Sequence, residues 1–156
     1  MMQSLSIYYA TMTGNTESLA RRLGERAASE DWTPHVIDLA KVRPPELVGR
    51  KFALFIVSTW GEGEPPADAT EFWYALEKAP LDLAGMRYAV LGLGDRDYSE
   101  YNAFARQLDA RLAAMGAQSL GERCEADVDF EDTYVNWENQ MIAVLDEARR
   151  SLVPAS

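Results

Sequence analysis

Hydrophobic and polar residues form two kinds of block along this 156-residue chain. Short apolar runs bounded by turn residues are typical of strands, and they occur at 5–10, 36–39, 52–58 and 88–91. Between these runs, apolar residues recur every three or four positions, which predicts helices over about 16–30, 68–78, 102–115 and 137–152. A last short strand is expected between Gln118 and Val128. Strands and helices are therefore predicted to alternate.

Turn-forming residues separate these blocks. The sequence Asp31-Trp32-Thr33-Pro34 breaks the first helix, Pro44, Pro45 and Gly49 mark a connection, and Gly116 ends the third helix. Because strand and helix alternate about five times, crossover connections predict an α/β fold with a doubly wound parallel sheet and helices on both faces. No linker or repeat divides the chain, so residues 1–156 are expected to form a single domain.

Charge and composition exclude several classes of function. The chain carries 15 basic and 25 acidic side chains, a net charge of −10, which disfavours binding to nucleic acid or to an anionic membrane. Cys124 is the only cysteine, so an intrachain disulfide and a thiolate-rich metal site are excluded, and we expect no metal. Cys124 and the lone His35 are interpreted as structural. Without an apolar run long enough for a membrane span or a secretion signal, we expect a cytoplasmic protein.

Three loops follow predicted strands and carry most of the chemistry. Ligands of open α/β sheets bind outside the carboxyl ends of the strands, so loops gathered there can build one site. The first loop, Thr11-Met12-Thr13-Gly14-Asn15-Thr16, combines hydroxyl groups, one glycine and the free N–H groups of a helix start. This composition suits a phosphate held by neutral donors, because no basic residue occurs between Met1 and Ala20. An ordinary turn before a capped helix is the alternative.

The second and third loops each present a large aromatic residue beside glycine. In Thr59-Trp60-Gly61-Glu62-Gly63, the tryptophan leaves a strand among residues that cannot cover it, so we expect a flat group to pack on it. In Gly92-Leu93-Gly94-Asp95-Arg96-Asp97-Tyr98, the tyrosine is suited to the opposite face of the same group. The alternatives are a Trp60 packed under its own loop and a Tyr98 or Tyr101 that caps the next helix. A phosphate at one end and a flat ring between two aromatics describe flavin mononucleotide (FMN).

In combination, the three loops resemble those of the flavodoxin family. The patterns Thr-Trp-Gly-Glu-Gly-Glu-Pro and Gly-Leu-Gly-Asp-Arg-Asp-Tyr are especially similar to the FMN domains of diflavin reductases, such as cytochrome P450 reductase and sulfite reductase flavoprotein, and to MioC-type flavodoxin-like proteins. The resemblance extends from Ser6 to about Leu145, and Arg96 departs from the small polar residue common at its position. It implies five parallel strands in the order 2-1-3-4-5 and noncovalently bound FMN.

Carried over residue by residue, the resemblance assigns phosphate contacts to the first loop, ring stacking to Trp60 and Tyr98, and ring-edge contacts to residues beside them. The residues implied to bind FMN are Thr11, Met12, Thr13, Gly14, Asn15, Thr16, Thr59, Trp60, Gly61, Gly94, Asp95, Tyr98, Asn102 and Asp129.

The predicted function is that of a flavodoxin, which shuttles single electrons at low potential between a flavin reductase and an acceptor redox protein. Acidic residues beside the second and third loops, among them Glu62, Glu64, Asp95 and Asp97, would oppose added negative charge on the flavin. The same residues would guide a partner with a basic docking face. We expect a monomeric redox carrier rather than a stand-alone enzyme.

Two other classes of protein fit parts of the sequence. An FMN-dependent NAD(P)H or quinone oxidoreductase would need a second nucleotide site, which the sequence does not show, and the acidic rim would repel that nucleotide. A phosphorylated receiver module would need an aspartate at the end of the third strand, where this chain has Ser58 and Thr59. Steady NAD(P)H oxidation would favour the first alternative, and a protein that ignores FMN would favour the second.

Overall fold

The structure is a computed structural model of residues 1–156, of which residues 3–10, 14–59, 65–95 and 102–151 are described here. Strands and helices alternate, with three 3₁₀ turns labelled η. The elements are β1 (Gln3–Ala10), α1 (Asn15–Ser29), β2 (Trp32–Asp38), η1 (Leu39–Lys41), η2 (Pro44–Leu47), β3 (Phe52–Ser58), η3 (Ala67–Ala69), α2 (Thr70–Lys78), β4 (Arg87–Leu93), α3 (Ala103–Ala114), β5 (Gln118–Ser119), β6 (Cys124–Ala126) and α4 (Glu131–Arg150).

All strand pairs of the sheet are parallel, and the strand order β2-β1-β3-β4-β5 confirms the predicted fold class. The prediction of a single last strand was wrong in detail, because two short strands, β5 and β6, both pair with β4. A turn at 119–121 interrupts the pairing, with Gly121 N donating to Ser119 Oγ at 3.2 Å. The last strand position of the sheet is therefore filled by two segments.

The second strand also differs from its prediction. It begins at Trp32, where a break was expected, and it includes Pro34. Proline is tolerated there because β2 lies at the edge of the sheet and pairs only with β1. Trp32 is fully buried, and its Nε1 donates to Asp146 Oδ1 on α4 at 3.0 Å. The strand therefore starts where the tryptophan enters the core.

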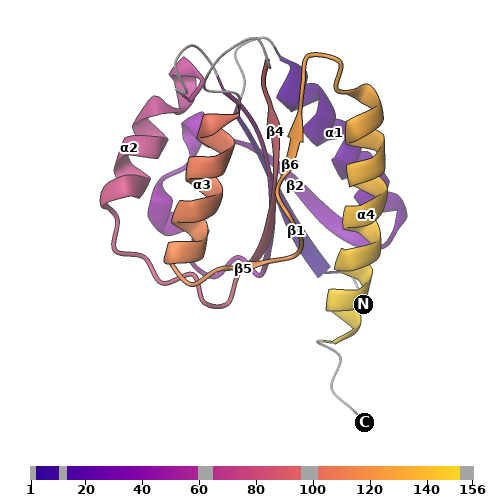
Figure 1. Ribbon diagram of the computed structural model, residues 1–156. Helices are drawn as coiled ribbons and strands as arrows, with labels where there is room; N and C mark the ends of the chain where they lie inside the picture. The colour runs from indigo at the N-terminus through magenta and orange to yellow at the C-terminus, as the bar shows by residue number, and fades with distance from the viewer. Residues whose placement is uncertain (1–2, 11–13, 60–64, 96–101, 152–156) are drawn as a thin grey trace.

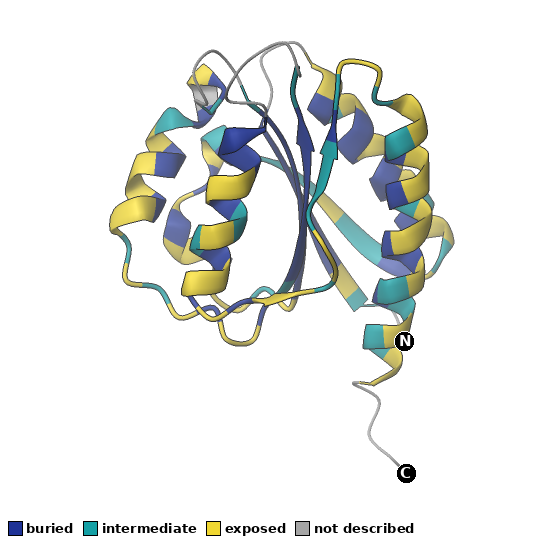
Figure 2. Ribbon diagram, viewed as in Figure 1, coloured by how far each residue is buried: buried dark blue, intermediate teal, exposed yellow. Residues whose placement is uncertain are grey.

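Helices cover both faces of the sheet, with α2 and α3 on one side and α1 and α4 on the other (Figure 1). Two hydrophobic cores result, and the apolar sides of the helices face the strands (Figure 2). Every residue of β3 is buried, as expected for a strand covered on both faces. In the part of the chain that the structure describes, no helix is both long and apolar enough to cross a membrane.

Candidate functional site

The carboxyl ends of β1 and β3 are tied together by side-chain hydroxyl groups. Ala10 O, the last carbonyl of β1, accepts hydrogen bonds from Thr16 Oγ1 at 2.9 Å and from Ser58 Oγ at 3.3 Å. Thr16 belongs to the first turn of α1, and Ser58 is the last residue of β3. Two strand ends and one helix start therefore meet at a single carbonyl. Thr16 is completely buried, so its hydroxyl group has a structural role here.

The start of α1 is suited to an anion. The N-cap residue is Gly14, with φ of 90°, and it has no side chain to cap the first N–H groups of the helix. The first N–H groups of a helix have no partner within the helix and lie at the positive end of its dipole. Gly14 and Asn15 are both exposed, and apart from the adjoining chain no atom of the described residues lies within 4 Å of the position that a Cβ on Gly14 would take. A ligand can approach this backbone closely.

Thr59 connects the end of β3 to two neighbouring elements. Its backbone N donates to Leu93 O, the last carbonyl of β4, at 3.0 Å. Its Oγ1 accepts from Phe104 N in the first turn of α3 at 3.0 Å. The side chain thus supplies the cap that the N-cap residue of α3, Asn102, does not provide. Thr59 therefore fixes the start of α3 against the ends of β3 and β4.

Asn102 is buried at the end of β4 with an unusual geometry. Its backbone is left-handed, with φ of 56°, and its side chain has no exposed surface. Asn102 Nδ2 donates to Ala126 O at the end of β6 at 3.2 Å, and Gly94 N donates to the same carbonyl at 2.9 Å. Asn102 Oδ1 accepts no hydrogen bond within the described residues. Buried polar atoms of this kind are uncommon and are often associated with functional sites.

Acidic residues gather at this end of the molecule. Asp95 and Asp127 are partly buried, whereas Asp129 is exposed on the connection between β6 and α4. At the start of α4, Glu131 accepts two hydrogen bonds of 2.8 Å from Arg22 on α1, and this pairing lowers the pKa of Glu131. The Arg22–Glu131 pair joins the two helices that cover one face of the sheet.

The structure brings several predicted FMN-binding residues to this end of the sheet. Gly14, Asn15 and Thr16 lie at the start of α1, Thr59 follows β3, and Gly94 and Asp95 follow β4. Asn102 precedes α3, and Asp129 lies before α4. The connection that carries Asp129 runs over the same end of the sheet as the tip of β4 (Figure 1).

The remaining predicted FMN-binding residues lie outside the described residues. They are Thr11, Met12, Thr13, Trp60, Gly61 and Tyr98. The predicted stacking of a ring between Trp60 and Tyr98 therefore stays a prediction.

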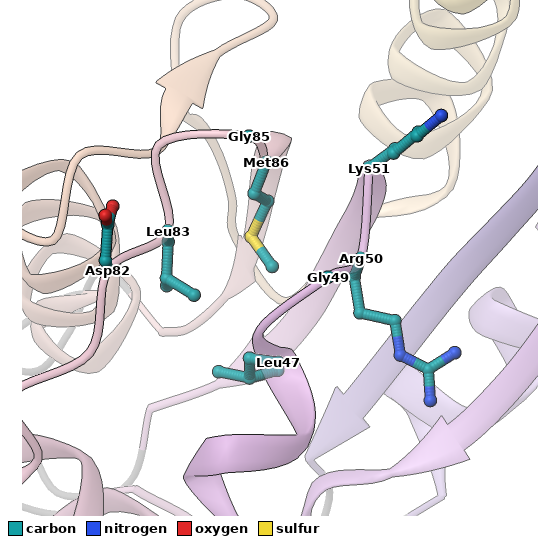
Figure 3. Close-up of a pocket in the computed structure, with 8 residues that line it drawn as sticks. All are labelled: Leu47, Gly49, Arg50, Lys51, Asp82, Leu83, Gly85 and Met86. Carbon is teal, nitrogen blue, oxygen red and sulfur yellow. The ribbon is translucent and has the colours of Figure 1, made fainter.

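A separate hollow of about 220 Å³ lies at the opposite, amino end of the strands. Leu47, Leu83 and Met86 line it, and the ends of Arg50 and Lys51 are directed away from Asp82 (Figure 3). None of the predicted FMN-binding residues lines this hollow. Because ligands of open α/β sheets bind at the carboxyl ends of the strands, we assign the functional site to that end of the sheet, which is called the loop end below.

The family is decided by comparison with known proteins. The flavodoxin family model matches residues 7–137, which is most of the chain. The chain belongs to the flavodoxin family. Among solved structures similar to this flavodoxin-family protein are two oxidised flavodoxins from Bacillus cereus. Flavodoxin 1 has a TM-score of 0.80 at 26% identity and covers 92% of this chain and 97% of its own. Flavodoxin 2 has a TM-score of 0.81 at 29% identity, with coverage of 93% and 99%.

The curated relatives are much longer proteins. The sulfite reductase [NADPH] flavoprotein alpha-component of Buchnera aphidicola is 30% identical over 92% of this flavodoxin-family chain and 24% of its own length. The NADPH–cytochrome P450 reductase of Oryctolagus cuniculus is 32% identical over 88% of this chain and 21% of its own. The chain thus spans about a quarter of the length of these relatives.

The described residues fit a flavin with a phosphate tail. The uncapped start of α1, with open space at Gly14, suits the phosphate. On the other side of β3, the backbone groups of Gly94 and Asp95 follow the end of β4, where they can serve as hydrogen-bonding partners for a ring edge. Family membership therefore implies a flavin cofactor, and no described feature of the site conflicts with it.

Some residues of the site were missed by the sequence analysis. Ser58 was not expected to link β3 to β1, and Ala126 was not expected to accept hydrogen bonds from Gly94 and Asn102. Gly92, which lies next to Asn102 and Ala105, was given no role of its own. Gly92 and Gly94 are two positions apart, so in extended chain they face the same side. Two glycines at this spacing indicate that a neighbouring segment packs closely on that side.

Proposed function

We propose that this protein binds FMN noncovalently and passes single electrons at low potential between a flavin reductase and an acceptor redox protein. The observation that carries the proposal is the meeting of the ends of β1, β3 and β4 beside the uncapped start of α1. Bound FMN supplies the one-electron chemistry. The residues of the chain bind it, orient it and set its electrostatic surroundings.

Each part of the site has a distinct role in this proposal. The backbone at Gly14 and Asn15 holds the phosphate without a formal positive charge, because the helix start provides donors and a favourable dipole. Backbone groups of Gly94 and Asp95 bind the polar edge of the ring. Trp60 and Tyr98 are proposed to pack on its two faces.

The acidic surroundings favour a low reduction potential. A carboxylate about 10 Å from the ring opposes one added negative charge by roughly 0.8 kcal/mol at an effective dielectric of about 40, before screening by salt. Asp95 follows the end of β4, and Asp127 and Asp129 follow the end of β6. Several such contributions together disfavour a reduction step that leaves a negative charge on the flavin, and so lower the potential of that step.

The same charges indicate the chemistry of the partners. A net charge of −10 with acids near the loop end attracts a redox protein whose docking face is basic. Such docking would bring the partner to the edge of the flavin. The rate of electron transfer between the two proteins should therefore fall as ionic strength rises.

A pair of matched glycine variants tests the proposal. Gly14 and Gly49 both have positive φ, of 90° and 91°, and a Cβ on either meets no atom within 4 Å. Alanine at either position therefore costs about 1–2 kcal/mol of backbone strain. Only Gly14 lies at the proposed phosphate site, so we expect Gly14→Ala to weaken FMN binding at least about tenfold, equivalent to 1.4 kcal/mol, and Gly49→Ala to leave it within about twofold.

Riboflavin, which lacks the phosphate, provides the control ligand. Gly14→Ala should not change riboflavin affinity, measured by quenching of flavin fluorescence. Equal losses of FMN affinity in both glycine variants would contradict the assignment of the phosphate site.

The alternative of an NAD(P)H or quinone oxidoreductase is tested on the same preparation. The names of the longer relatives include NADPH, but this chain spans only about a quarter of their length. We expect the isolated, FMN-loaded protein not to oxidise NADPH at a steady rate. Sustained turnover with a quinone acceptor would instead support the oxidoreductase.

A further inference from the structure

Gly94 and Asn102 both donate a hydrogen bond to one oxygen atom. Ala126 O, at the end of β6, accepts a hydrogen bond from Gly94 N at 2.9 Å and another from Asn102 Nδ2 at 3.2 Å. Gly94 immediately precedes the segment, and Asn102 immediately follows it. Gly94 and Asn102 are therefore held together by the end of β6, an element that is remote from both in sequence.

Asn102 has an energetically unfavourable conformation in the folded protein. It is a non-glycine residue with φ of 56°, in the left-handed region, and it is completely buried. The hydrogen bond from Nδ2 to Ala126 fixes the orientation of the amide, so Oδ1 faces away from that carbonyl and accepts no hydrogen bond within the described residues. A strained backbone and a buried acceptor without a donor are both unfavourable, and such residues cluster at functional sites.

The chain at the end of β4 leaves room for the side chain of Asn102. A Cβ on Gly92 would lie 2.6 Å from Asn102 Oδ1, and a Cβ on Gly94 would lie 3.1 Å from Asn102 N. The first distance is shorter than any real contact of a Cβ, and the second is tighter than most. Gly92 in β4 and Gly94 just after it therefore leave the space that Asn102 occupies.

We propose that Asn102 is a positioning residue: its amide bonds Ala126 O beside Gly94 N and thereby sets how Gly94 and Asp95 meet the flavin ring. This inference rests on the proposed FMN function. Asn102 acts through Ala126 and Gly94 rather than by touching the cofactor, because its side chain has no accessible surface. Its amide donor ties it to the carbonyl that also holds Gly94, and its left-handed backbone leads into α3.

Two substitutions separate the amide from the backbone conformation. Asn102→Gly keeps the left-handed backbone accessible and removes the amide, whereas Asn102→Ala removes the amide and also strains the backbone. Tyr88→Phe is the matched control, because it removes the hydrogen bond of 2.5 Å from Tyr88 Oη to Asp109 Oδ1 on the same helix, α3. This control removes a contact of α3 and leaves Gly94, Asn102 and Ala126 unchanged.

We expect Asn102→Gly to weaken FMN binding about tenfold, equivalent to 1.4 kcal/mol, and Tyr88→Phe to change it by less than about twofold. Asn102→Ala should weaken it at least as much as Asn102→Gly. In an anaerobic redox titration, the spacing between the two one-electron potentials should change in Asn102→Gly and stay constant in Tyr88→Phe. Equal FMN affinities and potentials in Asn102→Gly and the unsubstituted protein would overturn the proposal.

Amide hydrogen exchange in the flavin-free protein provides an independent readout. The Gly94 N–H should exchange about tenfold faster in Asn102→Gly than in Tyr88→Phe, because Asn102 then no longer holds the Ala126 carbonyl that Gly94 N bonds. Unchanged exchange at Gly94 would refute the coupling of Asn102 to Gly94, whether or not FMN binds. Failure of the unsubstituted protein to bind FMN, in contrast, would refute the proposed function, and exchange would still decide the role of Asn102 in the loop.

Discussion

Replacing Gly92 with alanine tests how closely α3 packs on β4 beside the site. The new Cβ would lie 2.6 Å from Ala105 Cβ and 2.6 Å from Asn102 Oδ1. Neither neighbour can move away cheaply, because Ala105 Cβ is fixed to the backbone of α3 and the Asn102 amide is held by Ala126. Overpacking by one methyl group costs about 1–3 kcal/mol, and the two close contacts place this site in the upper half of that range.

The unfolded state offsets part of this cost. Alanine restricts the unfolded chain more than glycine does, which stabilises the folded protein by about 0.4–1 kcal/mol. We therefore expect Gly92→Ala to lower the free energy of unfolding by about 1–2.5 kcal/mol net. With a urea m-value of about 2 kcal/mol/M, the unfolding midpoint of the flavin-free protein falls by about 1 M.

Gly85→Ala is the control for the same chemical change. A Cβ at Gly85 meets no atom within 4 Å, and its φ is not positive, so this variant should be as stable as the unsubstituted protein or slightly more stable. The assay is urea unfolding followed by circular dichroism. If Gly92→Ala were as stable as Gly85→Ala, the close approach of α3 to β4, and with it the described position of Asn102, would be refuted.

Two further predictions concern stability. Burial raises the pKa of Tyr88 and of Tyr134 above the ordinary value of 10, so the unfolded state loses protons first. As the pH rises above 10, each tyrosine should therefore lower the free energy of unfolding by up to about 1.4 kcal/mol per pH unit. Measured by urea unfolding, the free energy of unfolding of Tyr88→Phe should fall less steeply with pH than that of the unsubstituted protein. Thr59→Val removes the acceptor for Phe104 N and should cost about 1 kcal/mol in the same assay. Thr33→Val, on the edge strand, should change stability little, and an equal loss in both threonine variants would contradict the cap.

Much of the fold could be predicted from the sequence, because apolar spacing reports burial directly. The run Phe52–Ser58 is buried along its whole length, and Gly116 follows α3 with φ of 96°, as its position after the helix suggested. The extent of β2 could not be predicted in this way. A proline at position 34 signals a break locally, but at a sheet edge it has no second neighbour to bond. The interruption between β5 and β6 likewise depends on pairing with β4, which is not local.

The candidate site could be predicted only as a set of loops. Residue types and the rule for parallel sheets place Gly14, Thr59 and Gly94 at one end of the molecule, and the structure agrees. The hydrogen bonds that join these elements could not be predicted, because they link segments far apart in the chain. Asn102, for example, is 24 residues from its acceptor Ala126. Its role depends on a strand pairing that the sequence pattern located only approximately.

The central claim is that the loop end of the sheet holds one FMN molecule and uses it for single-electron transfer. The most direct measurement is the visible spectrum of the FMN-loaded protein during stepwise anaerobic reduction. We expect one tightly bound FMN per chain and two separate one-electron steps, the second at low potential. A protein that remains colourless with excess FMN, or that takes up both electrons in one step, would contradict it.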